Sequence, residues 1–289
     1  EFGRFLERLL TEKDNQESGT FAEEYTRHIL QGEPVPGIEM EHRLGRQFLP
    51  GIGLAEVNRL ARERMTPKNR VVMVSAPEKE GLEVPDESRL RAVLDRVSAM
   101  EIAPYEDTAA RKPLLPALPA PGKIAATAVL EDMKITEWRL ANGVRVVLRP
   151  TDFKADEVLL RAFSPGGTSL VEDQDYIAAA TAAMVVPAGG LGEFSAVDLD
   201  KRLAGKAAAV RPFIGETDEG LTGSASPKDI ETLFQLIYLS FTAPRCDPEI
   251  FGVLTSQMKD LLANRAASPE IAFSDALQTT LSGNHFRAR

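Results

Sequence analysis

The sequence predicts an α+β fold in which mainly antiparallel sheets carry helices on one face. Two local patterns favour this class. Asn142 and Gly143 separate two short strand-like runs, and this dipeptide accepts the positive backbone angles of a tight hairpin turn. Residues 226–241 repeat apolar side chains at helical spacing behind a Ser-Pro start. The length of 289 residues exceeds one small core and predicts about two domains.

The first 103 residues are expected to be helices around one strand. Thr20, with Glu23 three residues later, has the pattern of a capping box, so we expect Thr20 to be the N-cap of a helix. The continuous β-branched run at 69–77 predicts a strand covered on both faces. The other expected helices lie at 2–10, 39–49, 54–65 and 86–100.

Residues 104–134 are expected to be an interdomain linker, because proline is frequent in this segment and no periodicity is sustained. Residues 135–289 then alternate between strand and helix patterns. The segment 175–186 is rich in alanine and carries one charged side chain, Asp175, yet it is expected to be helical. The remaining expected elements are the hairpin around 142–143, a strand before Gly166, and helices from Ser226 and at 247–265.

Charge and hydropathy exclude several classes of protein. The net charge of −9 argues against a nucleic-acid partner, because that affinity depends on Lys and Arg neutralising phosphates. The longest apolar runs reach about twelve residues, short of the roughly 20 needed to span a bilayer. The single cysteine, Cys246, excludes an internal disulfide and a cysteine-based zinc cluster. Because residues 2–10 look like the middle of a helix and the chain stops abruptly, we expect a fragment of a longer protein.

An ordered series of weak motifs in residues 135–286 resembles the pitrilysin/insulinase family of zinc metallopeptidases, which includes relatives of the mitochondrial processing peptidase. The catalytic domain of that family opens with an L-x-N-G hairpin and a strand that ends in glycine and a small residue near a glutamate. Residues 140–148, Gly167 with Thr168, and Glu172 match this opening. The resemblance is to bacterial zinc proteases with two homologous halves on one chain.

The resemblance implies processing-peptidase-like domains and a position for this chain in its parent. Residues 1–103 would be the C-terminal part of the second, non-catalytic domain, and 104–134 the linker. Residues 135–289 would be the third domain, an inactive copy of the peptidase domain that is truncated at its C-terminus.

The zinc-binding helix of the family carries H-x-x-E-H, often followed by Met or an aliphatic residue. If Met184 takes that following place, the three motif positions fall on Ala179, Ala182 and Ala183. In the motif, residues i, i+3 and i+4 share one helix face, where two imidazoles bind the metal and the carboxylate serves as base. Zinc needs three protein ligands and an open position, and alanine has no donor atom.

The third ligand of the family, a glutamate, would fall near Asp260 or Leu261, and the sequence does not distinguish between them. Asp260 alone could not hold the metal. We therefore predict no catalytic, cofactor-binding or metal-binding residue in this chain, and zinc only in the parent chain.

Other candidate sites have ordinary interpretations that we favour. Cys246 precedes an expected helix, but no histidine lies near it in sequence to activate the thiol. The glycine loop at 187–195 lacks the Lys-Ser/Thr of a phosphate-binding loop, and the carboxylates at 215–220 lack the spacing of an EF-hand, so both are expected to be turns. The chain has three histidines, which we interpret as surface residues: His28, His42 and His285.

The expected function is that of a non-catalytic part of a pitrilysin-like zinc metalloendopeptidase, which helps to enclose the chamber where a peptide is cleaved. The expected partners are the peptide substrate and the N-terminal catalytic half of the same chain, with no nucleic acid and no membrane. The alternative is a non-catalytic scaffold or assembly subunit of the same family. The resemblance also implies a periplasmic or otherwise extracytoplasmic location in a bacterium. The sequence does not identify the peptide or the oligomeric state.

Overall fold

The computed structural model describes residues 1–289 with the exception of 67, 78–79, 104, 107–110, 266 and 289. Its contacts divide the chain into two compact units. The smaller unit is Glu39–Asp107, and the larger combines Glu1–Ile38 with Thr108–Arg289. The larger unit contains every strand found among the described residues and all the candidate positions in the segment that resembles the peptidase domain.

Helices dominate the smaller unit: α3 (Ile38–Phe48), α4 (Leu54–Arg64) and α5 (Glu87–Ser98). The α5 helix is capped by Asp86, whose carboxylate accepts the Arg89 backbone N–H at 2.8 Å. The strand expected at 69–77 is wrong, because no strand is formed over these residues and Val71 is 92% exposed. A β-branched run needs a neighbouring strand to complete its hydrogen bonds, and no strand pairs with it in the described part of the chain.

The larger unit begins with two helices, α1 (Phe2–Thr11) and α2 (Ser18–Gln31). The expected cap at Thr20 is wrong, because α2 starts at Ser18 and Glu17 occupies the N-cap position, three residues before Thr20. Gly32 follows the helix with φ at 69°, a left-handed conformation that closes the last turn and suits glycine.

The first sheet is a three-stranded antiparallel meander of β1 (Ile124–Leu130), β2 (Ile135–Leu140) and β3 (Arg145–Leu148). The predicted hairpin is confirmed, since Gly143 has φ at 91° and its N–H donates to the Leu140 carbonyl. The β1 strand lies within 104–134, so part of the segment expected to be extended linker pairs with β2.

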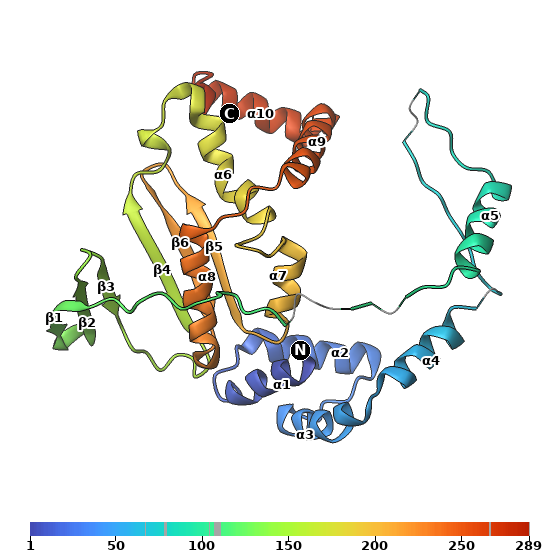
Figure 1. Cartoon of the computed structure of the whole chain (residues 1–289), viewed down its shortest axis with the longest axis horizontal. Helices are drawn as coiled ribbons and strands as arrows, with labels where there is room; N and C mark the ends of the chain where they lie inside the picture. The colour runs from blue at the N-terminus through green and yellow to red at the C-terminus, as the bar shows by residue number, and fades with distance from the viewer. Residues whose placement is uncertain (67, 78–79, 104, 107–110, 266, 289) are drawn as a thin grey trace. The chain divides into compact units, whose positions relative to one another are not determined.

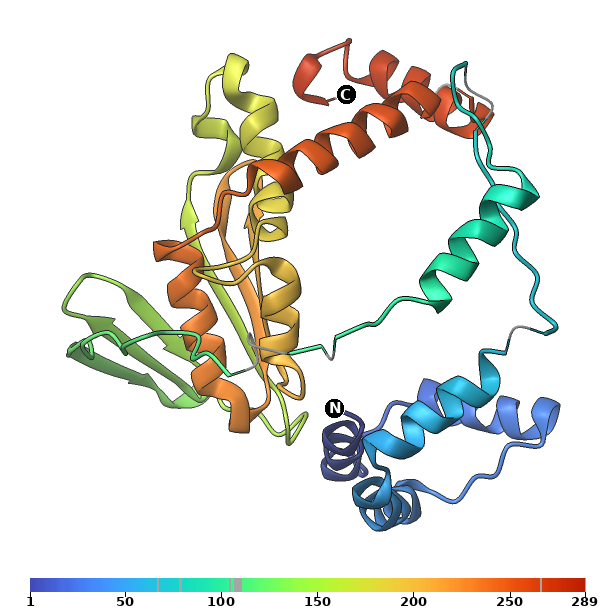
Figure 2. The same cartoon turned by 45° about the vertical axis from the view of Figure 1, so that its right-hand side comes forward.

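The second sheet contains β4 (Val158–Pro165), β5 (Ala208–Ile214) and β6 (Asp218–Ala225) in the order β4-β6-β5, with both pairs antiparallel. Three helices lie against one face of this sheet: α6 (Tyr176–Ala188), α7 (Ala196–Leu203) and α8 (Ile230–Thr242) (Figure 1). The α9 helix (Pro248–Arg265) and the α10 helix (Pro269–Leu281) follow (Figure 2). Short 3₁₀ turns occur at Leu49–Gly51, Glu131–Met133, Gly167–Leu170, Asp173–Asp175, Pro227–Asp229 and Phe286–Ala288. The predicted α+β class, with antiparallel sheets and helices on one face, is confirmed.

Only part of the apolar surface of the α8 helix faces the sheet. Leu233, Leu236 and Leu239 are buried, whereas Phe234 and Phe241 are 56% and 66% exposed. Both sides of this helix are apolar, so its periodicity does not decide which side packs. The core cluster around it consists of Leu114, Leu115, Phe194, Leu236 and Leu239.

Candidate functional site

The α6 helix is the segment in which the sequence places the three motif positions. It is helical as predicted, and Thr181 supports it locally by donating its hydroxyl to the Ile177 carbonyl at 2.8 Å. Two glycines follow its last turn. A Cβ atom on Gly190, where φ is 94°, would lie 2.1 Å from the Phe194 carbonyl oxygen, so the chain can turn this tightly only with glycine.

Ala179, Ala182 and Ala183 share one face of α6 and are half-buried. Ala182 and Ala183 line a largely apolar cavity of about 260 Å³ between α6, α8 and β5. The other residues around this cavity are Val186, Pro187, Leu191, Leu199, Val210, Pro212, Ile214, Ser240 and Pro244. The Ser240 hydroxyl donates to the Leu236 carbonyl within its own helix at 2.8 Å. Methyl groups thus occupy the three positions that the resemblance aligns with the zinc motif.

The two candidates for a third ligand lie on α9, and both are exposed, with Leu261 at 63%. Leucine has no donor atom, and a single aspartate leaves zinc short of the three protein ligands that it needs. Within the described residues, no group of three or more His, Cys, Asp or Glu side chains could hold a metal ion. The side chains at these positions therefore do not fit zinc.

The remaining candidates from the sequence lie apart from this helix face. His28 on α2 contacts the Glu33 carbonyl through Nδ1 at 2.7 Å, His42 lies on α3, and His285 stacks on Phe286. Cys246 is exposed in the segment before α9. The two segments expected to be turns are confirmed: Leu191 and Phe194 bridge within 187–195, and 215–217 join β5 to β6.

An arginine from the far end of the chain holds the loop that precedes α6. Arg287 donates to the carbonyl oxygens of Thr168 and Val171 at 3.0 and 2.7 Å, and to the Asp173 carboxylate. Its guanidinium lies 5.0 Å from the centre of the Tyr176 ring, a cation–π contact. The loop contains Gly167 and Thr168, so Arg287 fixes the segment that matches the family's opening motif. The sequence gives no sign of this contact, which joins residues more than 100 positions apart.

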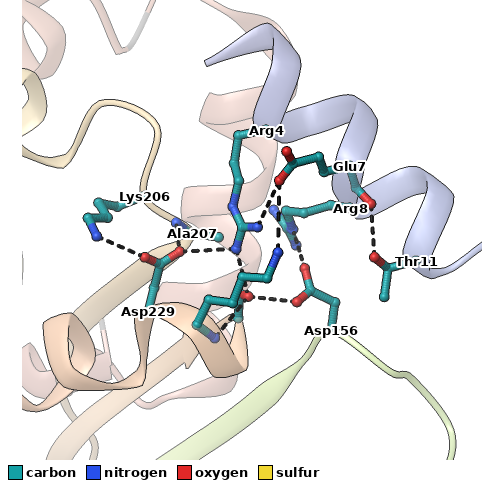
Figure 3. A network of polar contacts seen from close by, with 10 residues as sticks. Arg4, Glu7, Arg8, Thr11, Asp156, Lys206, Ala207 and Asp229 are labelled. Atoms are coloured by element: carbon teal, nitrogen blue, oxygen red, sulfur yellow. Dashed lines mark hydrogen bonds and ion pairs between the residues drawn. The ribbon is translucent and has the colours of Figure 1, made fainter. Parts of the chain in front are cut away.

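A network of polar contacts joins α1 to the turns at the ends of the second sheet (Figure 3). Asp156 and Asp229 are 8% and 5% exposed. Arg4 donates from Nη2 to Ser226 Oγ at 2.9 Å and to Asp229 Oδ2 at 3.4 Å, and Arg8 Nε lies 3.4 Å from Asp156 Oδ2. The cluster contains no histidine or cysteine, and basic side chains neutralise its carboxylates. It is therefore a structural contact and not a metal site.

The Asp229 carboxyl experiences opposing effects on its pKa. Burial alone raises the pKa, but hydrogen bonds from the Ala207 N–H and from Lys206, with the charges of Lys206 and Arg4, lower it more. The net pKa lies below the ordinary value of an aspartate, so the group is ionised at neutral pH.

Antiparallel sheets with helices packed on one face define the class of protein, an α+β fold like that of peptidase structures. Comparisons with known proteins support the insulinase/pitrilysin-like family of zinc proteases for this chain, because it is similar to two proteins named as zinc proteases.

The chain is 27% identical over 286 residues to an Arabidopsis thaliana protein named "Zinc protease PQQL-like", covering 97% of this chain and 27% of that protein. It is 23% identical over 233 residues to "Probable zinc protease PqqL" of Haemophilus influenzae, covering 80% of this chain and 25% of that protein. It therefore spans about a quarter of the length of these relatives.

Two solved structures have the same fold. A mutant of the ferredoxin protease FusC, in complex with Arabidopsis ferredoxin, matches with a TM-score of 0.53 and 21% identity, covering 91% of this chain and 30% of that chain. The periplasmic protease PqqL from Escherichia coli also matches with a TM-score of 0.53, at 16% identity, covering 96% of this chain and 31% of that chain. No family model matches the chain.

Proposed function

We propose that this chain is a non-catalytic part of a pitrilysin-like zinc endopeptidase and that it helps to enclose the chamber in which a peptide is cleaved. The observation that carries the proposal is the methyl-lined face of α6, where Ala179, Ala182 and Ala183 stand at the motif positions. A helix that offers no nitrogen or oxygen at these positions can pack against β5 but cannot bind zinc or activate water.

Exposed apolar side chains support a role that depends on further protein around this chain. On α8, Phe234 and Phe241 are exposed on the side away from the buried leucines. On β4, Leu159 and Phe163 are 74% and 67% exposed, and they alternate with residues that face the helices. Large exposed apolar surfaces of this kind mark contacts with other protein. Since this chain covers only about a quarter of each relative, the rest of the parent chain is the partner that we propose for these side chains.

On this proposal the residues that bind zinc and perform the cleavage belong to the N-terminal half of the parent chain. Residues 1–103 then end its second domain, 104–134 link the halves, and 135–289 form the third domain. The parent acts on peptides or proteins, as the ferredoxin protease among the structural relatives does. A location outside the cytoplasm is proposed from the periplasmic relative. In the described residues, no helix is both long and apolar enough to cross a membrane.

Equilibrium titration with zinc in competition with a fluorescent chelator tests the central claim. We expect no tight site in the chain. A variant in which His28, His42 and His285 are all replaced by alanine is the control, because it removes weak binding by surface histidines. One tight site per chain that survives in this variant would contradict the proposal.

The alternative, a scaffold subunit without any catalysis, is distinguished by the parent protein. The full-length product of the gene should cleave an unfolded protein substrate and lose that activity with a chelator if the proposal holds. A full-length product that lacks H-x-x-E-H and cleaves no substrate would favour the scaffold function instead.

A further inference from the structure

The second sheet has one face that points away from α6, α7 and α8, and we call it the free face. Successive side chains of a strand point to opposite faces of its sheet. Val210 and Pro212 of β5 line the cavity beside α6, so Arg211 between them points away from the helices. The same alternation, with the pairing of β4 and β5 to β6, assigns six residues to the free face: Leu159, Arg161, Phe163, Arg211, Phe213 and Thr222.

The centre of the free face is a cation held between two aromatic rings. Phe163 and Phe213 both pair with Gly220 of β6, so no side chain of that strand lies between the two rings. The Arg161 guanidinium lies 5.7 Å from the centre of the Phe163 ring and 5.2 Å from that of Phe213. It also donates to Asp218 Oδ2 at 2.9 Å. Arg161 therefore has its counter-charge within the chain.

Arg211 has no such counter-charge. It pairs with Thr222 of β6, and Arg161 pairs with the same threonine from the other side. In the part of the chain that the structure describes, the Arg211 side chain is exposed and forms no hydrogen bond, ion pair or ring contact. An arginine in water needs no protein partner. Covering its charge with protein is very costly unless a carboxylate meets it.

Apolar side chains on the free face indicate that other protein covers it. Leu159 and Phe163 are large and exposed, and exposed apolar surface is unfavourable in water. A peptide substrate would leave these side chains in water between catalytic cycles. A symmetric contact with a second copy would bring the arginines of two molecules together, and like charges repel. The rest of the parent chain fits better, since the relatives extend far beyond the part that matches this chain.

We propose that the free face is a docking surface for a segment of the parent chain that lies outside residues 1–289. This segment places a carboxylate against Arg211 and apolar side chains against Leu159 and Phe163. Charge complementarity at Arg211 selects the segment, while the apolar contacts contribute most of the buried surface. The inference rests on the proposed function only in that this chain is part of a longer protein.

Photo-cross-linking in the full-length product of the gene tests the inference. Thr222, between the two arginines, is replaced by the photoreactive residue p-benzoylphenylalanine, and the cross-linked peptides are identified by mass spectrometry. We expect the main cross-link to form within one molecule, to a segment outside residues 1–289 that has an aspartate or glutamate and an apolar residue close to the point of attachment.

Reversing the charge of Arg211 tests its part in the contact. Arg211→Glu should lower the yield of the cross-link by about tenfold, because two carboxylates would then oppose each other. Replacing the identified acidic residue with lysine in the same protein should restore the yield. The matched control is Arg139→Glu, which reverses an exposed charge on β2 and should leave the yield unchanged. In the chain alone, Arg211→Glu should not change the melting temperature, and a lower value would show that Arg211 has its partner inside the chain.

Four other results would contradict the inference. A cross-link between two molecules would show that a second copy covers the free face, and a cross-link only to an added substrate protein would show that substrate occupies it. Equal yields with and without Arg211→Glu would show that charge does not select the partner, and the absence of any cross-link would show that the face stays open. Each of these results would overturn the proposal. Loss of zinc binding or of cleavage in the full-length product would instead concern the proposed function, because the cross-link requires neither.

Discussion

Replacing Leu233 with alanine is expected to destabilise the larger unit by about 3 kcal/mol. The side chain is 0% exposed, and its Cδ1 lies 3.0 Å from the position that a Cβ atom on Gly223 would take, so α8 packs directly on β6 at this point. Leucine-to-alanine changes at buried sites cost about 2–5 kcal/mol, because the lost methyl groups leave a cavity. In a unit of about 150–250 residues, a loss of about 3 kcal/mol lowers the melting temperature by about 6–12 °C.

The neighbouring residue gives the control. Phe234 is 56% exposed, so Phe234→Ala removes a larger side chain but less buried surface, and we expect a cost of about 1 kcal/mol. Calorimetric melting of both variants, with urea unfolding followed by circular dichroism, compares them directly. A cost for Phe234→Ala that equals or exceeds that of Leu233→Ala would refute the reasoning, because α8 would then face the sheet with its other side.

Two further changes test the turn after α6 and the buried Asp229 carboxylate. Gly190→Ala should destabilise the chain by about 1–3 kcal/mol, because its positive φ and the nearby Phe194 carbonyl leave no room for a Cβ atom. Gly252→Ala, in open space within α9, should instead stabilise the helix by about 0.5–1 kcal/mol. Thermal melting measures both variants, and equal effects on stability would contradict the geometry. The folded-state pKa of Asp229 is lowered, so its stabilising contribution is present above the unfolded pKa near 4 and is lost as pH falls through the folded value. Asp229→Asn should therefore reduce the free energy of unfolding at pH 7 and have a smaller effect at pH 2. A difference in stability from the unaltered chain that grows on acidification would refute the lowered pKa of Asp229.

Elements determined by local chemistry were predictable from the sequence. The Asn142–Gly143 hairpin follows from a dipeptide that accepts positive φ, and α6 follows from the helix propensity of alanine. The Ser226 start of the helix before α8 also holds, since its hydroxyl accepts the Lys228 N–H. In each case the relevant interaction spans only a few residues, so a short segment contains the information.

Features that depend on distant partners were not predictable. The run at 69–77 has strand composition, but composition cannot show whether a neighbouring strand exists to accept its hydrogen bonds. The side of α8 that packs depends on the space above Gly223, which belongs to another element. The contacts of Arg4 with Asp229 and of Arg287 with Thr168 join positions 225 and 119 apart, and no local pattern encodes them.

The apolar face of α6 is held in the fold by packing and needs no metal to stabilise it. Ala182 and Ala183 face Val210 and Pro212 of β5 across an apolar cavity, so this helix is held by packing and by the tight turn that follows it. A histidine or glutamate placed at these positions would bring polar atoms to that apolar lining, which is unfavourable unless they find partners. The third-ligand region on α9, with Asp260 and Leu261 exposed, offers no such partner set. Introducing the motif alone would therefore cost stability without completing a zinc site.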